Sequence, residues 1–238
     1  MKNDKSLYNL ISSLSPTEKA YFRKSTTRGS TGKEKTYLKL FDAFDKLDCG
    51  TEYSEEPVKQ SLKGKRSLTQ LPVLKHYLYG SILRALNHYN EESDIDLKIG
   101  AMISQARLLY RKGLFKASLA KSAKASSMAR RLGKDILLLD ALHTERQTLR
   151  VYSSLNQSRE LLMKNYEEET FVLERLNNIS LYKKLLDELI IMATASGPAV
   201  TAKETRQFEN FLNRKELSDE SFAICTHSKI LFHQIVSF

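Results

Sequence analysis

The sequence predicts an all-α fold, and two features of the 238-residue chain indicate it. The chain contains 9 Gly and 4 Pro, whereas average usage would give roughly 17 and roughly 12 at this length. A chain with so few turn-forming residues has few turns, which argues against a sandwich or barrel of short strands. Apolar residues also recur at spacings of three and four along the chain, as they do on one face of a helix.

The first 92 residues predict a block of four or five helices. The apolar face of the first helix consists of Leu7, Leu10, Ile11 and Leu14. The run Ser15-Pro16-Thr17-Glu18 has the pattern of a capping box with Pro at the first helical position. It predicts the start of a second helix that runs to about residue 26, followed by a flexible loop over 27–33.

The rest of this block predicts three more helices. The third contains Tyr37, Leu40, Phe41 and Phe44 and ends at Gly50. A short helix near 54–63 is followed by the basic turn Lys63-Gly64-Lys65-Arg66. A long helix over about 68–90 then accommodates Pro72 in its first turn, where the missing N–H group costs nothing.

From residue 93 onward the pattern changes to paired helices, so we divide the chain into an N-terminal block (1–92) and a helical array (93–238). The expected helices cover 94–111, 115–132, 135–153, 157–177, 180–195, 201–214 and 219–238, with breaks at Gly113, Gly133 and Gly197-Pro198. Starts at about 94, 135, 180 and 219 define a two-helix unit of about 40 residues, which is typical of an α-solenoid. Neither helix of such a pair can bury its apolar face alone, so stacked neighbours are required.

Residues 102–125 resemble a tetratricopeptide repeat. The residues that match its pattern are Met102, Ala106, Leu109, Tyr110, Gly113, Leu114, Phe115, Ser118 and Ala125. Small Ala106 and Ser118 let the paired helices approach each other, and Gly113 turns the chain. The match is degenerate, since Ser122 replaces the usual aromatic residue and the period exceeds the 34 residues of a strict repeat. The N-terminal block resembles the openings of bacterial helical-repeat proteins, which implies no activity.

The resemblance implies a concave groove lined by the first helix of each pair. Carried over by the pattern and by a shift of 42 residues, the groove residues are Ser104, Arg107, Tyr110, Arg111, Arg146 and Tyr152, with Leu149 beside them and Asp187 and Glu188 from the third pair. Such a groove suits an extended or helical peptide whose carboxylates are bound by Arg. We therefore expect a non-catalytic scaffold that binds a peptide or protein segment.

Nucleic-acid binding is the alternative that the charge distribution leaves open. The formal charge is +10, and residues 1–134 hold 26 basic and 13 acidic side chains against 12 and 15 in the rest. An anionic partner would contact the cations Lys63, Lys65, Arg66, Lys121, Lys124 and Arg131. Residues 54–90 could also form a helix-turn-helix, although the start of the long helix offers few side chains that read bases.

The sequence shows no motif for catalysis, metal or cofactor binding. None of the five histidines has HxxxH or HExxH spacing, no CxxC pair occurs, and phosphate-binding glycine loops and G-x-S-x-G are absent. The run Glu167-Glu168-Glu169 points in different directions on a helix and suits a solvated face. We expect no enzyme activity and no cofactor.

The ends of the chain and its cysteines bear on the compartment and on self-association. No signal-peptide core or membrane-length apolar run occurs, and Cys49 and Cys225 suggest no disulfide, so we expect a cytoplasmic protein without membrane contact. The apolar C-terminal segment 230–238 lacks the polar cap that usually closes a solenoid. This segment predicts either a chain cut short or a homodimer formed through the last helix.

Overall fold

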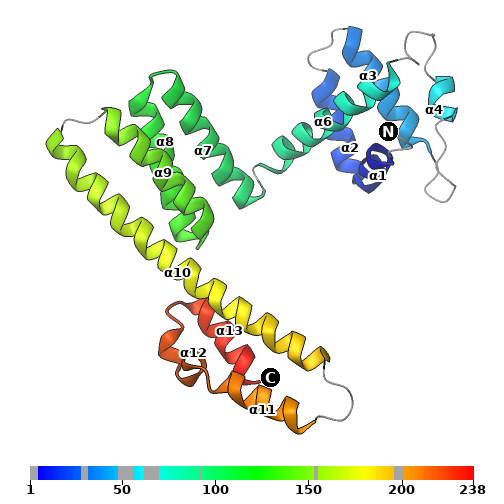
Figure 1. Cartoon of the computed structure of the whole chain (residues 1–238). Coiled ribbons are helices and arrows are strands. Elements are labelled where there is room, and N and C mark those ends of the chain that lie inside the picture. Colours follow the sequence, from blue (N-terminus) through cyan, green and yellow to red (C-terminus); the bar gives the residue numbers. More distant parts are fainter. Residues whose placement is uncertain are drawn as a thin grey trace. The chain divides into compact units, whose positions relative to one another are not determined.

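The computed structural model describes residues 5–27, 32–47, 56–61, 70–91, 93–152, 155–195 and 201–238. Every regular element in these ranges is a helix (Figure 1), which confirms the all-α prediction for this part of the chain. The chain divides into two compact units, residues 1–101 and 102–238. The predicted helix stop at Gly50, the basic turn 63–66 and the break at Gly197-Pro198 lie outside the described residues.

The first unit contains the helices that the N-terminal sequence predicts. They are α1 (Ser6–Ser13), α2 (Pro16–Thr27), α3 (Gly32–Asp45), α4 (Glu56–Ser61) and α6 (Leu71–Asn90). The capping box is confirmed, because the Ser15 backbone N–H donates to Glu18 Oε2 at 2.8 Å and the Glu18 N–H donates to Ser15 Oγ at 3.3 Å. Pro72 lies in the first turn of α6, as expected.

The core of the first unit gathers one apolar face from each of these helices. Its fully buried members include Ile11, Phe22, Phe41, Val58 and Ile82. The rings of Phe22 and Phe41 lie 4.8 Å apart between centroids, which joins α2 to α3. All the residues of this core come from the first unit.

The next three helices follow the sequence prediction closely. They are α7 (Ile95–Arg111), α8 (Phe115–Arg131) and α9 (Asp135–Tyr152). Gly113 and Gly133 have φ of 75° and 63°, a left-handed conformation that glycine adopts at low cost. Each follows a helix end at which the chain turns back by the same two backbone hydrogen bonds, such as Leu114 N–H to Leu109 O at 3.0 Å. Two glycines therefore set the positions of the first two turns.

Small side chains join α7, α8 and α9. Ser118 Oγ on α8 donates to the Ala106 carbonyl of α7 at 2.8 Å, and it lies 3.1 Å from Thr148 Oγ1 of α9. The buried face of α8 consists of Ser118, Ser122, Ala125, Ser126 and Ala129. Because none of these side chains is larger than serine, the axis of α8 can approach its neighbours closely, as the tetratricopeptide pattern implies for Ala106 and Ser118.

The prediction of two helices over 157–177 and 180–195 is wrong. A single helix, α10 (Leu155–Ala195), covers both, and it contacts α9 and then α13 (Thr226–Val236) along its length (Figure 1). Asn178 lies in α10, where the two predicted helices would have met, and its side chain bonds to the segment 222–224. Its Nδ2 donates to Phe222 O at 2.8 Å, and its Oδ1 accepts from Ile224 N–H at 3.1 Å. No helix starts at 180, so the 40-residue period does not extend past the second pair.

The predicted helix over 219–238 is also too long. The chain there forms a 3-10 turn (Glu220–Phe222) and then α13. Before them come α11 (Ala202–Leu212), which corresponds to the predicted helix over 201–214, and the short α12 (Lys215–Ser218). Asp219 ends α12 with its side chain accepting from Ser221 N–H at 2.6 Å. α13 buries Leu231, Phe232 and Ile235 in a core shared with Tyr182 of α10. The apolar end of the sequence thus has a packing partner within its own unit, and dimer formation through it stays a prediction.

Candidate binding face

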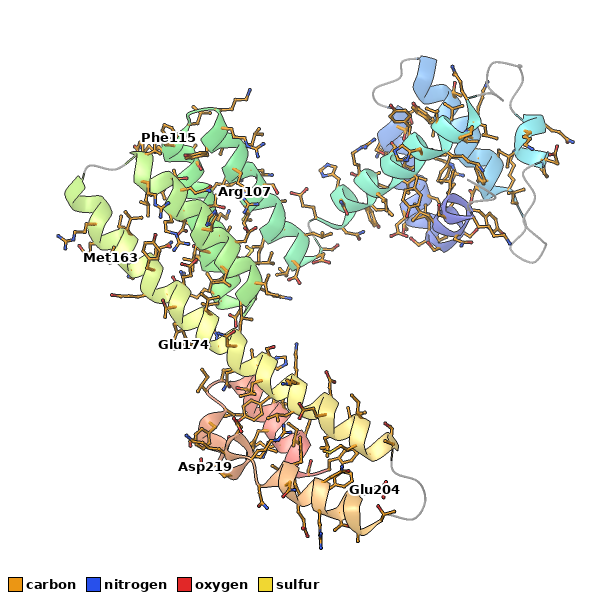
Figure 2. All side chains as sticks on the ribbon, viewed as in Figure 1. Arg107, Phe115, Met163, Glu174, Glu204 and Asp219 are labelled. Carbon is orange, nitrogen blue, oxygen red and sulfur yellow. The ribbon has the colours of Figure 1, made fainter. Side chains whose placement is uncertain are left out.

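An ion pair links α7 to α9 at the surface of the second unit. The Arg107 guanidinium, labelled in Figure 2, donates to Asp140 Oδ1, and both side chains are about two-fifths exposed. The two residues are 33 positions apart in the sequence. This pair fixes which sides of the two helices form a common surface, because residues three or four positions away on each helix share the same side.

This surface, which we call the α7/α9 face, combines apolar, polar and cationic groups. Its members from α7 are Ser104, Arg107, Leu108 and Arg111, and its members from α9 are Ile136, Asp140, His143 and Gln147. Leu108 and Ile136 are 57% and 74% exposed, and Ile136 is the most exposed large apolar side chain among the described residues. The Gln147 amide nitrogen lies 3.0 Å from His143 Nε2. Arg111 is exposed and makes no ion pair with a described residue.

Two of the predicted groove residues lie away from this face. Tyr110 is half-buried, and its ring packs edge-on against Phe115 at 5.5 Å between centroids. Tyr152, at the end of α9, is 46% exposed. It borders an open, apolar hollow of about 470 Å³ lined by Gly113, Leu114, Phe115, Lys116, Ala117, Ala120 and Tyr152. The structure therefore brings together Ser104, Arg107 and Arg111 but not the two tyrosines.

Arg146 is a packing residue in the contact between α9 and α10. It is 6% exposed, its Nη2 donates to Glu169 Oε1 at 2.5 Å, and its guanidinium lies 4.3 Å from the Tyr166 ring centroid. The hydrogen bond from Arg146 lowers the pKa of Glu169 below its ordinary value. With its guanidinium engaged in this way, Arg146 is not free to receive a peptide carboxylate, and we leave it out of the binding face.

The acidic residues expected from a third helix pair also lie elsewhere. Glu188 accepts from Arg214 Nη1 at 2.5 Å and lies 3.8 Å from Lys184 Nζ. Asp187 is its exposed neighbour on α10. Because α10 does not restart at 180, its second half packs against α11–α13 and supplies nothing to the α7/α9 face. Leu149, the remaining floor residue, is buried.

The cations predicted for nucleic-acid binding divide into two groups. Lys63, Lys65 and Arg66 lie outside the described residues. Lys121, Lys124 and Arg131 lie on α8, where Lys124 and Arg131 are exposed and Lys121 is half-buried. The neighbouring Arg130 is neutralised by α10, since its Nη2 donates to Glu168 Oε2 at 2.8 Å.

Two features near the candidate face were not predicted from the sequence. The first is the exposure of Leu108 and Ile136. Both fall outside the apolar stripes of their helices, and this position in the sequence could have predicted that they are exposed. The second is Glu145 of α9, whose contacts no sequence pattern predicts. Its side chain is half-buried, accepts from Ser126 Oγ at 2.6 Å, and lies 3.5 Å from Asn165 Nδ2 of α10. Burial raises the pKa of Glu145, against the opposing effect of the Ser126 hydrogen bond.

Comparison with known proteins finds no family model, no curated protein and no solved structure that matches the chain. Among the described residues, no group of three or more His, Cys, Asp and Glu side chains is placed to hold a metal ion. The helices of the described part include none with the length and apolar character needed to cross a bilayer.

Proposed function

We propose that α7, α8 and α9 form a tetratricopeptide-like helical unit that binds a segment of another protein along the α7/α9 face, without catalysis. The segment would lie across α7 and α9, with its apolar side chains against Leu108 and Ile136. A carboxylate of the segment would pair with Arg111. Because Arg binds carboxylates through two parallel hydrogen bonds, this contact would also fix the orientation of the segment.

The observation that supports this proposal most is the Arg107–Asp140 pair, which joins α7 to α9 on a face that also exposes Leu108 and Ile136. An exposed ion pair of this kind contributes little to stability, about 0–1 kcal/mol. It does connect the two helices, with Leu108 next to Arg107 in the chain and Ile136 one helical turn before Asp140. Protein-binding surfaces combine an apolar centre with a polar rim in this way.

A charge placed at Ile136 tests the proposal. Ile136→Asp changes a side chain that is 74% exposed, so folding should be preserved, and we expect capture of the bound protein from native cell extract to be lost. Ile191→Asp is the matched control, since Ile191 is 65% exposed on α10 of the same unit. If both variants retain the same bound proteins as the unmodified chain, the α7/α9 face is not the binding surface.

Nucleic-acid binding has weaker support as an alternative. The described cations proposed for it all lie on α8, a helix that contains no Asn or Gln and whose only aromatic residue is Phe115. Such a surface could contact phosphates but offers few groups that read base edges. The cations of α8 therefore suit a partner other than a nucleic acid.

A further inference from the structure

The longest stretch of one charge sign in the chain is centred on α8. Between Asp96 and Asp135 no acidic residue occurs. The basic residues in this interval are Lys98, Arg107, Arg111, Lys112, Lys116, Lys121, Lys124, Arg130, Arg131 and Lys134. A run of 38 residues with ten cations and no anion leaves a strong positive field unless other elements neutralise it.

Neighbouring helices neutralise only part of this charge. Arg107 pairs with Asp140, and Arg130 pairs with Glu168. Lys134 also has an interaction of its own. By contrast, Lys116, Lys124 and Arg131 are exposed and make no ion pair or hydrogen bond with any described residue. The positive charge that remains exposed lies on these three residues of α8 and on Arg111 and Lys112, where α7 ends.

The three unpaired cations follow one side of α8 at regular intervals. Lys124 and Arg131 are seven residues apart, so they lie about 10 Å apart along the axis and nearly in line. Lys116 precedes Lys124 by eight residues, or about 12 Å. The exposed residues between them, Ala117, Ala120, Ala123 and Ser127, are all small. No large exposed side chain therefore lies between these cations to prevent a second helix from packing along α8.

The apolar hollow lies at the N-terminal end of the same side. Lys116, Ala117 and Ala120 of α8 form part of its lining, and Leu114, Phe115 and Tyr152 supply its bulk. Leu114 is 55% exposed, and Figure 2 labels Phe115 at the start of α8. The hollow of about 470 Å³ is large enough for a single bulky apolar side chain.

We infer that the outer side of α8 binds an acidic α-helix of a partner protein. Three carboxylates spaced seven and eight residues apart on the partner helix would face Arg131, Lys124 and Lys116. One large apolar side chain beyond the last carboxylate would enter the hollow. This surface is separate from the α7/α9 face, so it goes beyond the proposed function and stands or fails independently of it.

The hollow favours an acidic helix over a nucleic acid. A polyanion held by phosphate contacts alone needs no apolar site, and α8 carries neither Asn nor Gln to pair with adenine. A helix with carboxylates seven and eight residues apart would match the cations, and its large apolar side chain would fill the hollow. Exposed charge pairs contribute mainly to association rate and orientation, so the apolar anchor has to supply much of the affinity.

Fluorescence anisotropy with designed peptides tests the inference. The probe is an alanine-rich helical peptide of about 20 residues with three glutamates at the stated spacing and a terminal Phe. We expect it to bind the full-length chain, and we expect affinity to fall about tenfold when the glutamates are redistributed at constant composition. Replacing the Phe with Ala should weaken binding in the unmodified chain but not in Tyr152→Ala, which opens the hollow.

Charge reversal on the protein completes the experiment. Lys124→Glu with Arg131→Glu should weaken binding of the probe about tenfold, whereas Lys183→Glu, an exposed position on α10, should leave it unchanged. Two results would overturn the inference: equal binding of the redistributed peptide, or tighter binding of single- or double-stranded DNA than of the probe at the same salt concentration. Both comparisons use peptides and DNA only, so they do not depend on the α7/α9 face.

Discussion

Glu145 is a half-buried carboxyl group in the contact between α8, α9 and α10. It accepts from Ser126 Oγ, and the nearby Asn165 has a buried Oδ1 without a hydrogen-bond partner among the described residues. Burial raises the pKa of Glu145 because the charged form is the one that loses hydration. The folded state therefore holds this proton more tightly than the unfolded chain does.

This pKa shift predicts that Glu145→Gln stabilises the second unit at neutral pH. Stability from a carboxyl with a raised pKa is complete below its unfolded pKa and is lost as pH rises through the folded pKa. Gln keeps an acceptor for Ser126 and has no charge. We expect a gain of about 1 kcal/mol at pH 7 that disappears near pH 4, measured by thermal unfolding. Glu167→Gln, at an exposed position, is the control, and a loss of stability at pH 7 would contradict the argument.

Arg146 and Arg107 should contribute differently to the free energy of unfolding. Arg146→Ala leaves Glu169 without its buried partner, and we expect a cost of about 2–3 kcal/mol in unfolding free energy. Arg107→Ala breaks an exposed pair and should cost no more than about 1 kcal/mol. Chemical denaturation measures both. Equal costs would show that burial of Arg146 does not decide its role.

At the scale of the element, α10 is one helix because no glycine or proline interrupts it between residues 155 and 195. The side chain of Asn178 makes hydrogen bonds with both sides of the segment 222–224. This polar side chain thus ties the second half of α10 to the chain just before α13. This contact accounts for the packing of α13 against a helix that begins beside α9.

We predict that Asn178→Ala destabilises the C-terminal helices by about 1–2 kcal/mol, because two backbone groups lose their partner. Asn177→Ala provides the matched control: Asn177 is the exposed neighbour and makes no hydrogen bond with a described residue. Hydrogen exchange at α13 should quicken in the first variant and stay unchanged in the second. Unchanged exchange in both would mean that Asn178 does not hold the segment.

The elements that the sequence predicted correctly are those whose ends are decided locally. Gly113 and Gly133 end α7 and α8 through their own backbone conformation, and Ser15 with Glu18 starts α2 within four residues. The division of α10 was wrong because the partner of Asn178 lies 44 residues away. The role of Arg146 was hidden in the same way, since Glu169 contacts it across a helix interface.

For the whole molecule, the sequence predicted the all-α class and part of the candidate site. Ser104, Arg107 and Arg111 share one face because helical spacing alone places them there. Leu108 lies with them for the same reason, whereas Ile136 and Asp140 join that face only through the contact between α7 and α9. The unbalanced charge of residues 97–134 was visible in the sequence, but its concentration on one side of α8 depended on which arginines found acidic partners.

Site-specific photo-cross-linking tests the central claim most directly. A photoreactive residue is placed at Ser104 on the α7/α9 face, at Ser127 on the outer side of α8, or at Ser180 on α10, all three of which are exposed serines. After irradiation in native extract, the account predicts a cross-linked protein at Ser104 that is absent at Ser180 and is lost when Ile136→Asp is added. No product at Ser104, or the same products at Ser104 and Ser180, would contradict it.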